Sequence, residues 1–356
     1  MVISILRKIK DYLKELIKLF YIFPGYGRLL NEYRGCSGKK IILIGTPAHG
    51  NLGDHAIAVT ELEFIRDYCK EAEIFEIPTP LYKTHGKFLK NNVGKDDVIV
   101  ISGGGWMGNL WIHNELMIRS IVEDFSSNKV IIFPQTLYYT EDTVGLKTAE
   151  ETRKCFQKHK NIYLSVRESN SMRAASELLG LSEDDGRLLF CPDMVLYGSL
   201  STADKVKKDN KSVLLCLRGD IEKSADISSV KNLIDSFGYN TENISTVDTA
   251  LIKKKEREYR LKALLNSFAE AEFVVTDRLH AMIFSLLAGV PCYVFNNVTG
   301  KVFGVATYLQ KSGFPVKMLG GIEEINKDTF NLSGSAYELK GELKAYFSSL
   351  GQLLDS

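Results

Sequence analysis

The sequence lacks an excess of charge of either sign. Its 356 residues include 45 Lys and Arg against 44 Asp and Glu, a formal net charge of +1. A chain without a basic surplus has no global field that attracts nucleic acid. We therefore expect no nucleic-acid partner, and any anion site must come from a local arrangement of side chains.

Paired cysteines are also missing. None of the six cysteines forms a CxxC pair, and Cys216 and Cys292 lie inside apolar, strand-like runs. Buried free thiols in a reducing compartment have this distribution. We expect no disulfide, no metal site and no cofactor, and a cytoplasmic location. The six positions are 36, 69, 155, 191, 216 and 292.

Long hydrophobic runs are absent too, even from the apolar N-terminus. Residues 1–23 have apolar positions at helical spacing, but Lys or Arg at 7, 8, 10, 14 and 18 leaves no run that could cross a bilayer. A secretory cleavage site is not apparent either. The pattern predicts an amphipathic helix. It lies either on the anionic inner face of the cell membrane or on the body of the protein, and periodicity does not separate these two.

Strand-like and helical segments alternate along the remaining chain. The strand-like runs are apolar on both faces, which is typical of parallel sheets covered by helices. A polar stretch at 199–211 predicts a linker. We expect an α/β fold of two Rossmann-like domains whose parallel sheets face a cleft, as in the GT-B architecture. The expected parts are an N-terminal helix (1–35), the two domains (36–200 and 201–335) and a C-terminal helix (336–356) that packs on the first domain.

The first glycine-rich loop, Gly45–Asp54, follows a β-branched strand. In open α/β sheets, ligands bind where strands end, and glycines let backbone N–H groups approach them. Asn51 and Gly53 are therefore candidates for contact with an anionic substrate. Alternatively, Asn51 and Asp54 cap the helix that follows.

A second glycine string, Gly103-Gly104-Gly105-Trp106, follows another strand and with Gly108 formally matches the GxGxxG dinucleotide fingerprint. The next strand ends in Gln135 and Thr136, however, instead of the acidic residue that holds a ribose. An NAD site is therefore poorly supported. We predict a tight strand-to-helix turn that binds an anion, or a sugar ring against the indole.

Charged side chains follow two later strands. Arg167 in SVRE is a permanently protonated fork suited to phosphate or carboxylate. Its alternative role is a salt bridge with Glu168 or Asp193, and Asp193, after a proline, is equally a turn residue. Arg278 and His280 in TDRLH begin another helix beside Asp277, and these surroundings suit an anionic substrate and proton transfer.

The blocks NLGDHAI, ISGGGW, FPQT, SVRE, CPD and TDRLHAMIFSLLAGVP occur here in the order and spacing of polysaccharide pyruvyl transferases. From about residue 40 to about residue 310 the chain resembles that family. The resemblance implies a GT-B-like enzyme that transfers pyruvate from phosphoenolpyruvate to two hydroxyls of a sugar. A cyclic ketal forms and phosphate is released. The sugar then belongs to a cell-surface polysaccharide or its lipid-linked precursor.

The resemblance also implies roles for particular residues. The essential histidine of the family corresponds to His280, and its donor-binding cations to Arg167, Arg278 and Lys301. Segment 296–299 is Asn-Asn-Val-Thr, where the family often has aspartate, serine and tyrosine, and this departure concerns the acceptor. We expect His280 to protonate the methylene carbon. A carboxylate accepts the hydroxyl proton, and the candidates are Asp54 and Asp193.

Two other functions compete with this reading. A GT-B glycosyltransferase would use a nucleotide sugar as donor, but the chain has no clear EX₇E-like block to hold a ribose. A non-catalytic glycan-binding relative would keep the fold without the chemistry. The filled set of cationic and glycine positions argues against such decay.

Overall fold

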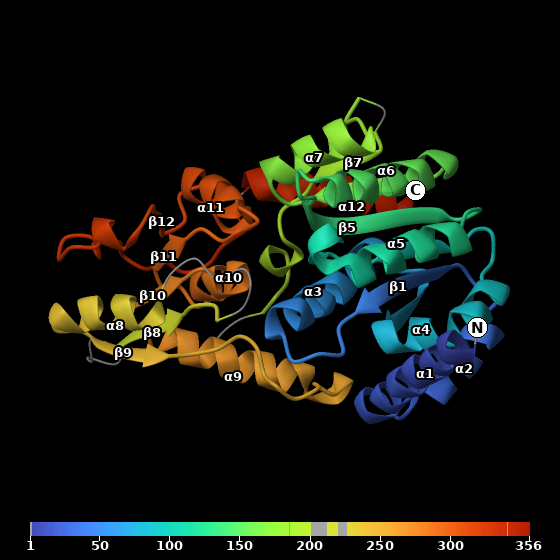
Figure 1. The fold of residues 1–356 in the computed structure, drawn as a ribbon, viewed down its shortest axis with the longest axis horizontal. Helices are drawn as coiled ribbons and strands as arrows, with labels where there is room; N and C mark the ends of the chain where they lie inside the picture. The colour runs from blue at the N-terminus through green and yellow to red at the C-terminus, as the bar shows by residue number, and fades with distance from the viewer. Residues whose placement is uncertain (1, 185, 201–211, 220–225, 340) are drawn as a thin grey trace.

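The protein is built on two parallel β-sheets (Figure 1). The computed structural model describes residues 2–184, 186–200, 212–219, 226–339 and 341–356. Within them, the first sheet has seven strands in the order β2-β1-β3-β5-β6-β7, with β4 paired to β5, and the second has five in the order β12-β11-β10-β8-β9. These sheets confirm the predicted α/β class with two Rossmann-like halves.

The first unit consists of the first sheet and helices α3 to α7. Ile41, Ile42, Leu43 and Ile44 of β1 are fully buried, so helices cover both faces of this sheet. Its strands are β1 (Lys40–Thr46), β2 (Glu73–Pro78), β3 (Val98–Ile101), β4 (Gly104–Gly108), β5 (Lys129–Tyr138), β6 (Ile162–Val166) and β7 (Leu188–Phe190). Its helices are α3 (Leu52–Tyr68), α4 (Thr79–Asn91), η1 (Asn109–Trp111), α5 (Ile112–Asp124), α6 (Thr143–Lys158), α7 (Ser169–Leu179) and η2 (Met194–Leu196).

The second unit repeats this arrangement around the second sheet. Residues 199 and 200 of the expected linker lead toward it, and 201–211 lie outside the described residues. Its strands are β8 (Ser212–Cys216), β9 (Asn240–Asn243), β10 (Phe273–Thr276), β11 (Cys292–Phe295) and β12 (Val316–Leu319). Its helices are α8 (Ile227–Ser236), η3 (Lys254–Glu256), α9 (Arg257–Ala269), α10 (Leu279–Leu287), α11 (Lys301–Lys311) and η4 (Ile322–Glu324).

Helices from both ends of the chain pack on the first unit (Figure 1). Helices α1 (Val2–Ile22) and α2 (Tyr26–Gly35) precede β1, and α1 lies against α4. The C-terminal α12 (Gly341–Asp355) returns to α3, where the Phe347 ring lies 6.3 Å from that of Phe64. Lys129 Nζ also donates to the Leu353 carbonyl at 3.1 Å.

Several elements differ from the sequence-based expectations. The glycine string does not turn directly into a helix, because β4 and η1 separate it from α5. The sequence of residues 243–250, NISTVDTA, predicts a strand, but strand β9 ends at Asn243 and a loop occupies the rest of that segment. Helices α2, α4 and α11 and strand β12 were not expected. Proline and glycine near the starts of α2 and α4 resemble turn signals, yet Pro80 occupies the first turn of α4, where its missing N–H costs nothing.

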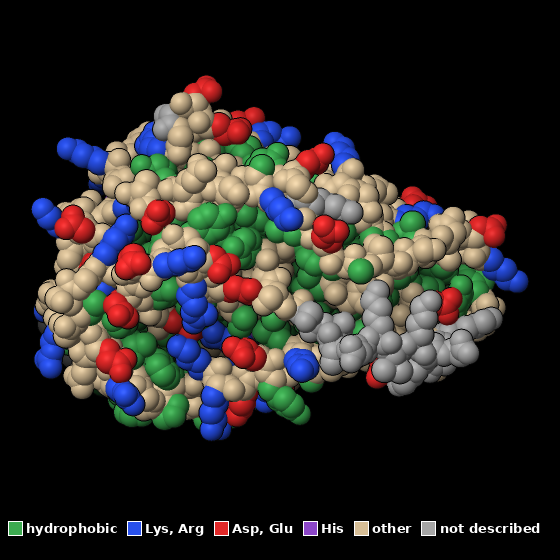
Figure 2. Space-filling model, turned by 180° about the vertical axis from the view of Figure 1, so that it is seen from behind, with side chains coloured by type: hydrophobic (Ala, Val, Ile, Leu, Met, Phe, Trp, Pro, Cys, Tyr) green, Lys and Arg blue, Asp and Glu red, His purple; other side chains and the backbone are tan. Residues whose placement is uncertain are grey.

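The surface carries charges of both signs. On the face seen in Figure 2, basic and acidic side chains alternate over the visible surface without a broad region of one sign. This distribution agrees with the near-zero net charge. In the part of the chain that the structure describes, no helix is long and apolar enough to span a membrane.

Candidate functional site

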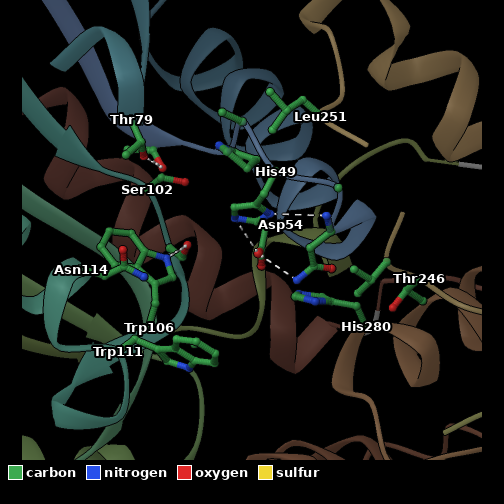
Figure 3. Close-up of a pocket in the computed structure, with 18 of the residues that line it drawn as sticks. His49, Asp54, Thr79, Ser102, Trp106, Trp111, Asn114, Thr246, Leu251 and His280 are labelled. Atoms are coloured by element: carbon green, nitrogen blue, oxygen red, sulfur yellow. Dashed lines mark hydrogen bonds and ion pairs between the residues drawn. The ribbon is translucent and has the colours of Figure 1, made fainter. Parts of the chain in front are cut away.

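A cavity of about 580 Å³ lies where the strand ends of both units meet. Loops after β1, β3, β6, β8, β10 and β11 contribute to its wall, as expected for parallel sheets that face each other. Figure 3 shows His49, Asp54, Trp106 and His280 around it. Among the described residues, no three His, Cys, Asp or Glu side chains gather as metal ligands would. The cavity's Lys and Arg side chains are Lys18, Lys83, Arg167, Arg218, Arg278 and Lys301.

Asp193 connects the two residues that the sequence singled out most strongly. Arg167 Nη1 donates to Asp193 Oδ2, and His280 Nε2 lies 3.5 Å from the same oxygen. Arg167 Nε also donates to Thr136 Oγ1 at 3.0 Å. Burial raises the pKa of Asp193, but Arg167 and His280 outweigh it and hold that pKa well below its ordinary range. The carboxylate thus fixes a cation of the first unit and an imidazole of the second.

These contacts show which carboxylate forms the salt bridge with Arg167. Asp193 pairs with Arg167, and its Oδ1 also accepts the Val195 N–H at 3.0 Å, so it is an ion-pair partner and a turn residue together. Glu168 instead caps α7 by accepting backbone N–H groups at its N-terminus. Asp193 and Arg167 are both only 1% exposed, and Arg167 and His280 line the cavity. A buried carboxylate in a tight ion pair is poorly placed to take a proton from substrate.

Two glycines allow the charged groups to come together. A Cβ on Gly53 would lie 2.1 Å from His280 Nδ1, so the start of α3 packs directly on the imidazole. A Cβ on Gly105 would lie 2.8 Å from Arg167 Nη2 and 3.4 Å from Lys301 Nζ. Cations from the two units therefore meet over the backbone of Gly105.

The first glycine-rich loop is ordered by its own side chains. Asn51 caps α3, because its Oδ1 accepts the Gly53 N–H at 3.1 Å. Its Nδ2 donates to Asp54 Oδ2 at 2.8 Å, and His49 Nε2 lies 3.5 Å from that oxygen. Asp54 remains 25% exposed and lines the cavity with Asn51. The capping alternative thus holds for Asn51 without removing it from the cavity wall.

A buried glutamate supports the second glycine string. Glu61 accepts the Gly103 N–H at 2.6 Å and the Ser102 hydroxyl at 2.7 Å. Burial raises the pKa of Glu61 to about 8, although both hydrogen bonds lower it. Trp106 donates its indole N–H to the Gly103 carbonyl at 3.0 Å and lines the cavity. Gly104 has φ +144°, a conformation that favours glycine.

Comparison with known proteins identifies the family. The family model described as polysaccharide pyruvyl transferase matches residues 51–298, more than half of the chain. The chain belongs to this family. The matched segment runs from Asn51 past His280, and Lys301 lies just beyond it.

Two curated relatives and one solved structure are similar to the chain. General stress protein 30 of Bacillus subtilis (strain 168) is 32% identical over 277 residues, which cover 77% of each chain. Pyruvyl transferase 1 of Schizosaccharomyces pombe is 27% identical over 273 residues, 73% of this chain and 66% of that one. A protein of Klebsiella pneumoniae has a crystal structure that matches with a TM-score of 0.53 at 16% identity, over 84% of this chain and 98% of that one, and it shows the fold alone.

Several other residues line the cavity of this pyruvyl transferase family member and were not predicted from the sequence. Arg218 follows the buried strand β8, and the same signal that identified Arg167 could have found it. Glu15 and Lys18 reach the cavity from α1, which no local pattern predicts. The loop after β9 also contributes: Thr246 accepts the Leu52 N–H at 2.8 Å.

A buried polar network joins the two units beside this loop. Arg257 donates from Nη2 to Glu76 at 2.8 Å and from Nε to His55 Nδ1 at 3.1 Å. Lys254 pairs with the other Glu76 oxygen at 2.8 Å. Burial raises the pKa of Glu76, but both cations outweigh it and bring the pKa to about 2. Burial, and then Arg257, lower the pKa of His55 to about 4, so this histidine is neutral at pH 7.

Proposed function

We propose that the protein transfers pyruvate from phosphoenolpyruvate to two hydroxyls of a sugar, forming a cyclic ketal and releasing phosphate. The sugar belongs to a cell-surface polysaccharide or to its lipid-linked precursor. One observation carries the proposal: Arg167 of the first unit and Lys301 of the second meet at Gly105, in a cavity that Arg278 and His280 also line. A donor with a phosphate and a carboxylate needs at least two such fixed cations.

The donor phosphate fits best at Arg167 and Lys301. Asp193 and Thr136 hold two nitrogens of the guanidinium, and the third, Nη2, lies at Gly105 beside Lys301 Nζ. This support fixes the fork before substrate arrives, which lowers the entropy cost of binding. Arg278, at the N-terminus of α10, then faces the donor carboxylate. The positive end of the helix adds to its attraction.

His280 is the proposed acid. Its Nε2 faces Asp193, which leaves Nδ1, over the bare backbone of Gly53, to deliver a proton. As the first sugar hydroxyl bonds to the central carbon of phosphoenolpyruvate, the double-bond electrons take this proton at the methylene carbon, which becomes a methyl group. The second hydroxyl then bonds to the same carbon, and phosphate leaves with the electrons of its C–O bond.

Asp54 is the proposed base for the hydroxyl protons. Its carboxylate lies on the cavity wall, positioned by Asn51 and His49. Asp193 is better suited to positioning, because its buried carboxylate already serves Arg167 and His280. The reaction as written requires no cofactor beyond the donor substrate.

The test is release of inorganic phosphate from phosphoenolpyruvate, screened against candidate glycan acceptors. We expect His280→Gln to abolish release and to leave phosphoenolpyruvate binding, measured by calorimetry, largely intact. The matched control is His113→Gln, because His113 is exposed and its side chain is not one of those that line the cavity. Near-normal turnover of His280→Gln would remove this residue from the mechanism. Thermal stabilisation by nucleotide sugars but not by phosphoenolpyruvate would favour a glycosyltransferase, and no turnover with any acceptor would favour a glycan-binding relative.

A further inference from the structure

Helix α1 uses two opposite faces in different ways. Leu19 and Ile22 are buried in the core of the first unit, so one face packs on the protein. The other face exposes a line of apolar side chains three or four residues apart, which reaches 70% exposure at Ile17. We call this line the apolar stripe; it consists of Leu6, Ile9, Leu13, Ile17 and Phe20. Packing on the body, one of the two alternatives for residues 1–23, therefore describes one face of the helix, and the membrane alternative concerns the other face.

Each side chain of the apolar stripe stays at least half exposed, including Phe20, whose ring lies 5.3 Å from that of Tyr26 in α2. The opposite face already anchors the helix against α4, and the end of the helix is held by the second unit. There, Lys253 Nζ lies 4.8 Å from the centre of the Tyr21 ring, and Lys254 Nζ lies 4.9 Å from that of Phe23. A contiguous exposed apolar row on an already anchored helix marks an interaction surface.

Charge identifies the partner of this surface. Arg7, Lys8, Lys10 and Lys14 are all exposed on the same helix, interleaved with the apolar stripe. Exposed apolar side chains flanked by lysine and arginine are what an anionic lipid surface binds, through burial of the stripe and attraction of the cations. A second copy of the chain would bring the same cations against each other, which costs energy.

The same helix forms part of the cavity wall. Glu15 and Lys18 line the cavity, and they neighbour the stripe residues along the helix. A docked α1 would therefore hold the cavity rim about one helix diameter, roughly 10 Å, from the lipid headgroups. An acceptor sugar attached to a membrane lipid could reach the cavity without leaving the membrane.

We propose that α1 docks the protein on an anionic membrane surface and that the acceptor is presented there as a lipid-linked glycan. The docking rests on the exposed stripe and the cations alone, whereas the acceptor class rests on the proposed pyruvyl transfer. The two parts are therefore tested separately.

The docking test uses the full chain and sedimentation with phosphatidylcholine vesicles that contain about a quarter phosphatidylserine. We expect the protein to pellet with these vesicles and to bind pure phosphatidylcholine more weakly. Ile17→Glu should weaken binding by about tenfold or more, because it removes an apolar side chain that the lipid would bury. It also adds a negative charge, which the anionic lipid repels. Lys10→Gln should weaken it about fivefold, and only with the anionic vesicles.

Val144→Glu is the matched control, because Val144 is also exposed, at 64%, but lies on α6, away from α1. It should bind vesicles as the unchanged protein does. Two results would overturn the docking: failure of the unchanged protein to bind anionic vesicles, or equal binding by Ile17→Glu. Sedimentation velocity tests whether the apolar stripe instead binds a second copy of the chain. A dimer that Ile17→Glu converts to monomers, in a protein that does not bind vesicles, would show this.

The acceptor test compares one glycan in two forms, attached to its lipid in vesicles and cut from it. Ile17→Glu should lower phosphate release with the lipid-linked form at least several-fold and leave release with the cut form unchanged. An equal effect on both forms, or none on either, would overturn the acceptor class. If neither form supports phosphate release while vesicle binding holds, the proposed pyruvyl transfer fails and the docking stands.

Discussion

Replacing Gly53 with alanine tests whether the position of His280 controls turnover. The structure allows no room for a Cβ there, because it would lie 2.1 Å from Nδ1 and 2.4 Å from Cγ of His280. Ordinary contacts at Cβ begin near 3.4 Å, so the ring must retreat by about 1.3 Å or the start of α3 must move by as much. Either shift changes the distance and the angle between His280 Nδ1 and the bound donor.

A misplacement of about 1 Å in a catalytic group costs on the order of 100-fold in rate, or about 2.7 kcal/mol of transition-state stabilisation. We therefore expect Gly53→Ala to lower kcat for phosphate release about 100-fold. Phosphoenolpyruvate binding should change little, because Arg167 and Lys301 meet at Gly105 and not at Gly53. Rate and calorimetric binding constant are measured on the same preparation.

Gly27→Ala is the matched control for this change. Gly27 is the second residue of α2 as Gly53 is of α3, and no atom lies within 4 Å of its Cβ position. It should keep full activity. Turnover of Gly53→Ala within threefold of the unchanged protein would refute the assignment of His280 Nδ1 as the proton donor. A loss of donor binding as large as the loss of rate would show that Gly53 also supports donor binding.

Three further variants test the buried charges. Asp193→Asn leaves the guanidinium of Arg167 without its anionic partner, so urea denaturation should show a loss of about 3–5 kcal/mol in unfolding free energy, and unchanged stability would contradict the buried ion pair. Glu61→Gln tests a carboxyl whose pKa is raised in the folded state from 4.5 to about 8. The unchanged protein should lose stability as pH rises through this range, and the variant should not. Melting temperatures measured across the range would show the difference. Arg257→Met removes one of the two cations that lower the pKa of Glu76 to about 2. It should destabilise the protein near pH 7 and reduce the further loss of stability as pH falls from 4.5 toward 2. An unchanged acid unfolding profile would count against the network.

Local sequence patterns predicted many of the helices and strands. The apolar strands and the helices after them follow from periodicity, because strand and helix burial repeat over a few residues. Arg167 and His280 were predictable as cavity residues because each follows a buried strand, and parallel strands end at one edge of a sheet. Arg218 obeys this rule and was still overlooked.

The sequence alone determined the two-domain α/β fold, the family motifs, and which strand ends bear the cations, since each depends on residues close together in the chain. Only the tertiary structure decided which of these groups touch. It paired Asp193 with Arg167 and His280, brought Lys301 to Gly105, and turned one face of α1 inward and the other outward. Those contacts join segments far apart in sequence, and they depend on how the two sheets and the N-terminal helix pack, which no local periodicity encodes.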